Sequence, residues 1–263
     1  EKHQKASDTE ILSARNFNKQ QFFGFAGLIN LRGTSGDVKI LLDDKEMGSR
    51  TLPSGYYELH KGALYRYNRK VYEVVSLTKI QTGGTAIVIE SKEQNKRTIP
   101  IVITNLKKAE AQSRAEIKLS HDNQAILTYG IIELERTITG YYKGEYNKSI
   151  EEMNLIRGVD IPNWYNFVWT SKHLAVGLVL PQNFTQEIDY ERAIHTIIHV
   201  LSTAAKIVTK AEAIEIDAYY EDGIIYLYDN TAEGANGCSQ MIYENFEEIK
   251  KVVGDSGIYI NDR

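Results

Sequence analysis

The sequence around Asp229 combines an acidic residue with a glycine-containing loop. Two alternating runs joined by a tight turn predict a strand hairpin over residues 213–228, and the second strand ends in Asp229. Gly234 and Gly237 follow, and a helix is expected from about Ser239. A carboxylate followed by small residues and free helix N–H groups can present a binding site, often for a phosphate. A strand–turn–helix connection with nothing bound gives the same pattern, and geometry alone favours it.

His195 and His199 are one helical turn apart, a spacing that can place two imidazoles on one metal ion. Asp229 or Asp217 could supply a third ligand, which would give a metal-dependent hydrolase or nuclease whose metal activates water. No glutamate directly follows the first histidine. Two histidines packed against a sheet therefore remain the simpler interpretation.

Two segments, residues 62–74 and 136–148, interleave basic and aromatic side chains. Aromatic rings can stack on unpaired bases while Lys and Arg bind phosphates. A strand hairpin with one buried face produces the same alternation, so both interpretations stand on sequence alone. The candidate nucleic-acid-binding residues of these segments are Tyr65, Arg66, Tyr67, Arg69, Lys70, Arg136, Tyr142 and Lys143.

Composition limits the classes of function. The formal net charge is −4, so a nucleic-acid contact requires a local basic patch. The single cysteine, Cys238, excludes an internal disulfide and a thiolate zinc site within the chain, and it suits a cytoplasmic protein. No apolar run has the length of a membrane span, and no signal peptide is visible. P-loop, GxGxxG and GxSxG motifs do not occur, so we expect no ATP site in this chain.

The order of the expected elements predicts an α+β fold with a β-rich N-terminal half. Residues 1–21 are expected to be a lead-in segment, 22–120 a β-rich subdomain and 121–263 an α+β subdomain. Short runs rich in Val, Ile, Tyr and Thr predict a small antiparallel barrel or curled sheet. These predicted strands are Val38–Leu42, Gly55–His60, Ala63–Tyr67, Lys70–Leu77, Thr85–Ser91 and Thr98–Thr104.

The second half is expected to hold one long central helix packed on a sheet. Apolar residues cover most of a helix over 190–208, whereas Leu106–Arg114 is charged and is interpreted as a linker or short helix. Further strands are expected at 115–120 and 127–139. Because the chain starts at Glu1 without a methionine, we expect it to be a fragment of a longer protein.

Five sequence blocks occur in an order that resembles a helicase family. They read GLINLRGTSGDVKIL, LHKGALYRYNRKVYEV, GIIELERTITGYYK, HTIIHVL and YLYDNTAEGANG. Together they resemble the C-terminal domain, formerly uncharacterised and described as zinc-binding, of mitomycin repair factor A-like DEAD/DEAH-box DNA helicases. The resemblance covers about residues 27 to 249. Where the family has Pro-Gly-Gly, this chain has Ala232-Glu233-Gly234, and Glu233 would repel a phosphate.

The resemblance implies an accessory domain of an ATP-dependent DNA helicase that acts in DNA repair. Such a domain would contact single-stranded DNA, brace the motor domains in cis or in trans, or do both, and it adds Arg32 to the candidate DNA contacts. ATP and Mg²⁺ would be bound by the motor, and the zinc-binding cysteines of relatives are absent here. We therefore expect neither a cofactor nor catalysis in this chain. A protein-interaction scaffold that docks motor domains through apolar and tyrosine-rich surface is a third possibility.

Overall fold

The computed structural model describes residues 36–80, 83–119, 124–180, 190–230 and 237–255. The chain divides into two compact units, Glu1–Gly33 and Thr34–Arg263, and every described residue belongs to the second. The predicted lead-in segment and Arg32 therefore lie outside the described residues.

A five-stranded sheet, called sheet A below, is built from the short runs rich in β-branched and aromatic residues. Its order is β2-β1-β5-β4-β3, and all neighbours are antiparallel except β1 and β5, which are parallel. The strands are β1 (Asp37–Leu42), β2 (Lys45–Thr51), β3 (Leu64–Tyr67), β4 (Lys70–Ile80) and β5 (Gly83–Glu90). Alternation along these strands buries Val38, Ile40, Val74 and Val88 on one face.

The sequence predicts a strand over Gly55–His60, and this prediction is wrong. Residues 55–58 belong to the short helix α3 (Ser54–Glu58), and Leu59 follows its last residue. Tyr56 and Leu59 are both buried, and their spacing of three places them on one helical face. Gly55 lets the helix approach β1 and β2 closely, because a Cβ there would lie 2.8 Å from Val38 and 2.9 Å from the carbonyl of Arg50.

A second, six-stranded sheet, called sheet B, contains much longer strands. Its order is β10-β11-β9-β7-β6, and β8 pairs with β7 outside this path. The strands are β6 (Lys96–Lys118), β7 (Gln124–Glu145), β8 (Asn154–Arg157), β9 (Phe167–Val179), β10 (Ile216–Glu221) and β11 (Ile224–Asp229). The predicted boundary after residue 120 falls between β6 and β7, so this sheet contains strands from both predicted subdomains.

The expectation of a linker or helix over Leu106–Arg114 is also wrong, because this stretch lies inside β6. β6 is an edge strand whose side chains are mostly solvent-exposed here, so charged residues are compatible with a strand. Its pairing with β7 overrides the helix preference of the Lys, Glu and Ala residues. The pairing register shifts at three points, between Ile101 and Val102, Leu106 and Lys108, and Ala111 and Ser113.

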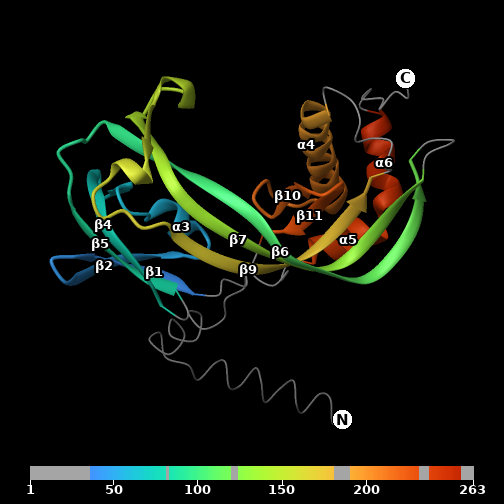
Figure 1. The fold of residues 1–263 in the computed structure, drawn as a ribbon, viewed down its shortest axis with the longest axis horizontal. Coiled ribbons are helices and arrows are strands. Elements are labelled where there is room, and N and C mark those ends of the chain that lie inside the picture. Colours follow the sequence, from blue (N-terminus) through green and yellow to red (C-terminus); the bar gives the residue numbers. More distant parts are fainter. Residues whose placement is uncertain (1–35, 81–82, 120–123, 181–189, 231–236, 256–263) are drawn as a thin grey trace, which may run out of the picture. The chain divides into compact units, whose positions relative to one another are not determined.

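Three helices cover one face of sheet B at one end, as Figure 1 shows. They are α4 (Tyr190–Thr209), α5 (Cys238–Glu244) and α6 (Phe246–Asp255), and the 3₁₀ turns η1 (Ile150–Glu152) and η2 (Gly158–Asp160) flank β8. Ile194, Leu201 and Ala205 of α4 pack with Leu127 and Ile225 of the sheet. The predicted α+β class and the long helix on a sheet are thus confirmed. Within the described part of the chain, no helix is both long and apolar enough to cross a membrane.

Sheet B curls strongly enough that its two outer strands meet. The Tyr219 hydroxyl of β10 donates to the Thr104 carbonyl of β6 at 3.2 Å, and the Leu106 amide of β6 donates to Glu221 Oε2 at 3.2 Å. Burial, followed by the hydrogen bond to Glu221, raises the pKa of Tyr219 to about 12, so its hydroxyl stays protonated. Ile132, Leu134, Ala175, Tyr226 and Tyr228 form the core inside this curl.

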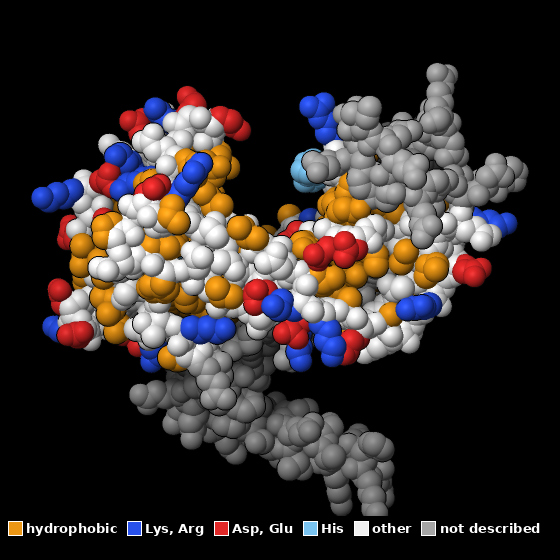
Figure 2. All heavy atoms as spheres, viewed as in Figure 1, with side chains coloured by type: hydrophobic (Ala, Val, Ile, Leu, Met, Phe, Trp, Pro, Cys, Tyr) orange, Lys and Arg blue, Asp and Glu red, His pale blue; other side chains and the backbone are white. Residues whose placement is uncertain are grey.

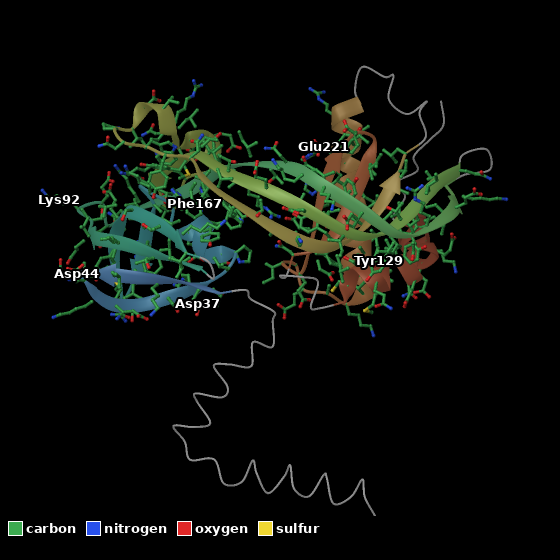
Figure 3. The ribbon with its side chains drawn as sticks, turned by 60° about the horizontal axis from the view of Figure 1, so that its bottom comes forward. Asp37, Asp44, Lys92, Tyr129, Phe167 and Glu221 are labelled. Carbon is green, nitrogen blue, oxygen red and sulfur yellow. The ribbon has the colours of Figure 1, made fainter. Side chains whose placement is uncertain are left out.

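Sheet A packs against the other end of the long strands. Ile138 of β7, together with Phe167 and Trp169 of β9, joins the same core as Val38 and Tyr56. In Figure 3, Phe167 lies beside sheet A, whereas Tyr129, on the same sheet B, lies beside the helices. Sheet B therefore carries one core at each end of its long strands.

Leu134 provides a test of the core inside the curl. It is fully buried, so we expect Leu134→Ala to lower the free energy of unfolding by about 2–5 kcal/mol in urea denaturation. Ile103→Ala on β6 is the control, because Ile103 is 49% exposed and its loss should change stability by less than about 0.5 kcal/mol. Equal effects of the two substitutions would contradict the curled arrangement.

Candidate nucleic-acid interface

A cavity of about 380 Å³, called the basic–aromatic pocket below, opens where β2, α3, β3, β6 and the end of β7 meet. Its lining contains four cationic side chains, three tyrosines and one carboxylate. These are Arg50, Arg66, Lys96, Arg97, Tyr57, Tyr65, Tyr146 and Glu58. The pocket is thus locally positive although the chain as a whole is negative.

Tyr146 lies close to two of these guanidinium groups and is 60% exposed. The Cζ atoms of Arg66 and Arg97 lie 5.3 Å and 5.7 Å from the centre of its ring, within the range of cation–π attraction. One terminal nitrogen of each arginine is also anchored, because Arg66 donates to the Gln94 carbonyl and Arg97 to the Lys148 carbonyl, both at 2.9 Å. The two cations are therefore held in place.

These contacts leave donors available for an anion. The salt bridges among the described residues involve neither Arg66 nor Arg97. The Nε of Arg97 is buried and out of reach of an anion, so the available donors are the terminal N–H groups of Arg66 and Arg97 that do not contact the two carbonyls. Because a guanidinium presents its N–H groups as a planar fork that matches a phosphate, the arrangement suits a phosphate oxygen.

The other two cations of the pocket are partly neutralised. Arg50 donates through Nε to Glu58 at 2.8 Å, and its Cζ lies 5.0 Å from the Tyr65 ring centre. Lys96 lies 2.6 Å from a Glu93 carboxylate oxygen. We conclude that Arg66 and Arg97 carry most of the available positive charge.

The structure brings together only two of the residues predicted from the sequence, Tyr65 and Arg66. Tyr65 is 4% exposed and burial raises the pKa of its hydroxyl, so it forms a wall of the pocket and offers no open ring face. Four further residues line the pocket without having been predicted from the sequence: Arg50, Lys96, Arg97 and Tyr146. Lys96 pairs with Glu145, which places the start of β6 beside the end of β7. Lys96, Arg97 and Tyr146 could have been assigned to one site only if this strand pairing had been predicted.

The remaining predicted contacts in the two segments lie outside the pocket lining. Arg69 is in the tight turn between β3 and β4 with a φ of 65°, and Lys70 forms an exposed salt bridge with Glu90 at 3.0 Å. Tyr67 stacks on Tyr65 with ring centres 6.4 Å apart. Farther along the chain, Tyr142 is half-buried on β7, and Lys143 forms an ion pair with Glu93.

Arg136 has a structural role that the sequence did not predict. It is 4% exposed, so it cannot bind a ligand at the surface, and its predicted role as a DNA contact is wrong. Its guanidinium donates to Ser171 Oγ at 2.6 Å and to the Tyr228 hydroxyl at 3.0 Å, and that hydroxyl donates to Asp217 at 3.0 Å. Arg136 thus links β7 to β9, β11 and β10.

Asp229 is fully buried and its carboxylate is used within the fold. The backbone N–H of Ser239, in the first turn of α5, donates to Asp229 Oδ1 at 2.8 Å. In return the Asp229 N–H donates to Ser239 Oγ at 3.2 Å. Gly237 precedes α5 with a φ of 67°, a conformation that favours glycine, whereas Gly234 lies outside the described residues. Asp229 therefore fastens β11 to α5.

The three-ligand metal site does not assemble. In the described ranges, no three side chains of the His, Cys, Asp and Glu types gather as a metal site. Asp229 is bonded to Ser239, and Asp217 to Tyr228. His195 and His199 lie next to each other and are exposed on α4, so the expectation that they pack on a sheet is wrong as well.

A scan of protein-family models and a search of curated proteins find no match to this chain. Among solved structures, the chain is similar to the DUF1998 helicase MrfA bound to DNA, with 17% identity, a TM-score of 0.55, and coverage of 85% of this chain and 30% of that one. The described chain has the fold of part of this helicase. The resemblance predicted from the sequence is thus confirmed at the level of the fold.

Two further structures of the same helicase also match. One is bound to DNA and AMPPNP, with 15% identity, a TM-score of 0.48, and coverage of 90% of this chain and 30% of that one. The other is a crystal structure described simply as the DUF1998 helicase MrfA, with 15% identity, a TM-score of 0.45, and coverage of 86% of this chain and 31% of that one. The chain therefore spans less than a third of the length of the structures it matches.

The buried Asp229 carboxyl predicts a pH dependence of stability. Burial raises its pKa from 3.8 to about 6, so the folded protein holds this proton more tightly than the unfolded chain does. The resulting stabilisation is complete below pH 4 and is lost as the pH rises through about 6. We expect the unfolding free energy of Asp229→Asn, measured relative to that of the native protein, to rise between pH 4 and pH 7. The rise should be on the order of 3 kcal/mol, and a pH-independent difference would contradict this role.

Proposed function

We propose that this chain is a helicase-associated domain that contacts single-stranded DNA through the basic–aromatic pocket. The observation that carries the proposal is the Arg66–Tyr146–Arg97 cluster, two anchored guanidiniums beside an exposed ring. The fold shared with a DNA-bound helicase supports the proposal independently of this cluster.

The cluster suits an unpaired strand because it offers both partners that such a strand needs. The free N–H groups of Arg66 and Arg97 bind phosphate oxygens, and Tyr146 offers ring surface to a base. Tyr146 also holds the guanidiniums in position, which reduces the entropy lost on binding. Glu58 lines the pocket and Glu93 pairs with Lys96, so both carboxylates weaken the positive potential of the pocket. We therefore expect modest affinity that falls steeply with salt.

The chain would act beside a motor and would not be a motor itself. Motor domains, in cis or in trans, would bind ATP and Mg²⁺ and translocate along the DNA, whereas this domain would hold the strand between steps. Such a role fits a helicase that acts in DNA repair.

Substitution of the two free arginines tests the DNA contact. We expect Arg66→Ala/Arg97→Ala to weaken binding of a fluorescent oligo(dT) by at least tenfold at low salt, because two phosphate contacts are lost. The slope of log K against log salt should fall by about 1.4, since each contact to a single strand contributes about 0.7. Fluorescence anisotropy over a salt series measures both quantities.

Lys39→Ala provides the matched control for this experiment. Lys39 is an exposed cation of β1 that is paired with Glu46 at 3.3 Å and does not line the pocket. Its loss removes one positive charge and should leave oligo(dT) binding within twofold of native. If the double arginine variant also binds like the native protein, the pocket is not the DNA contact.

An exposed apolar face of sheet A favours a second role, the bracing of motor domains. Val75, Ile80, Ile87 and Ile89 of β4 and β5 are 37–51% exposed, which is unusual for so many large aliphatic side chains on one small sheet. Burial of this face against a motor domain would remove apolar surface from water.

A charge substitution on this face separates bracing from DNA binding. We expect Ile87→Lys/Ile89→Lys to abolish co-purification with the helicase motor domains of the same system while oligo(dT) binding is retained. Because both side chains already face solvent, the variant should fold, as circular dichroism would verify. Undiminished co-purification would exclude this face as the docking surface.

A further inference from the structure

The exposed histidine pair of α4 has a geometry that the DNA contact does not explain. His195 Nε2 and His199 Nε2 lie 3.1 Å apart, and the two ring centres are separated by 4.5 Å. Both side chains are exposed. The neighbouring hydroxyls of Thr196 and Thr203 donate to backbone carbonyls one turn earlier, so they do not compete for the imidazole nitrogens.

We propose that His195 and His199 form a two-ligand site for a divalent transition metal such as Zn²⁺, Ni²⁺ or Cu²⁺. Imidazole nitrogens bind zinc at about 2.0–2.1 Å, and two such ligands 3.1 Å apart enclose an angle at the metal of about 100°. This angle is close to that of a tetrahedral site. Neutral imidazole is a preferred ligand for zinc, copper and nickel, whereas Mg²⁺ and Ca²⁺ prefer oxygen.

Two ligands make an open site and not a structural one. Structural zinc sites have four protein ligands, whereas this pair leaves at least two coordination positions for water or for a donor of another molecule. The site is unrelated to a thiolate centre, because Cys238 is buried. Figure 2 shows histidine side chains, in pale blue, at the surface over α4 and beside a hollow of the molecule. A metal held there would be accessible to a molecule that enters this hollow.

Copper(II) titration followed by electron paramagnetic resonance tests the site in the full chain. We expect one equivalent of Cu²⁺ whose spectrum shows coupling to two imidazole nitrogens. His199→Ala should leave one coupled nitrogen and weaken binding at least tenfold, and His195→Ala/His199→Ala should abolish the signal of this site. Arg192→Ala is the matched control, because Arg192 is exposed one turn before His195 and should not change the spectrum.

Isothermal titration with Zn²⁺ and a melting curve provide independent measurements. Because a metal that binds only the folded chain stabilises it, Zn²⁺ should raise the melting temperature of the native protein and not that of the double histidine variant. Equal Zn²⁺ affinity in the two proteins would overturn the proposal. It would also be overturned if the native protein bound no metal, since the 3.1 Å separation would then reflect a direct hydrogen bond between the rings.

Discussion

The pairing of β6 with β7 along almost their entire length is the interaction on which the rest of the structure depends. β7 is regular where it pairs with β9, so residues an odd number of positions apart, such as Leu127 and Ile138, face opposite sides of sheet B. Leu127 faces the helices and Ile138 faces sheet A. One continuous strand can therefore support two cores on opposite faces, while Arg136 links it to the neighbouring strands between them.

The basic–aromatic pocket is a product of the same pairing. Arg97 is at the start of β6 and Tyr146 directly follows β7, and the two meet only because these ends of the hairpin are adjacent. Arg66 reaches the same ring from sheet A. A cationic site can thus exist on a chain of net charge −4, because charge acts locally and exposed charges are screened over about 8–10 Å.

The sequence predicted the helices and strands in which apolar residues repeat with a clear period. It did not predict those whose structure depends on contacts with residues distant in the sequence. The helix over 190–208 and the hairpin ending at Asp229 were recognisable because apolar residues repeat with the period of each element. Gly55–His60 was misassigned because tyrosine and leucine occur in both helices and strands. Leu106–Arg114 was misassigned because the charges of an exposed edge strand resemble those of a linker. Arg136 could not be recognised as buried, since its partners Ser171 and Tyr228 are distant in sequence.

The exposed edge of β6 has a consequence for how copies of this chain behave together. A long, flat, unpaired strand would offer its backbone to the same strand of another copy and lead to aggregates or fibres. Here the edge carries Lys107, Lys108, Glu110 and Arg114, and three register shifts disturb its flatness. Self-association along this strand would require these charged side chains to lose hydration and would leave backbone groups out of register. Beyond the contact with β10 at Thr104 and Leu106, this edge can therefore remain exposed to water and still oppose polymerisation.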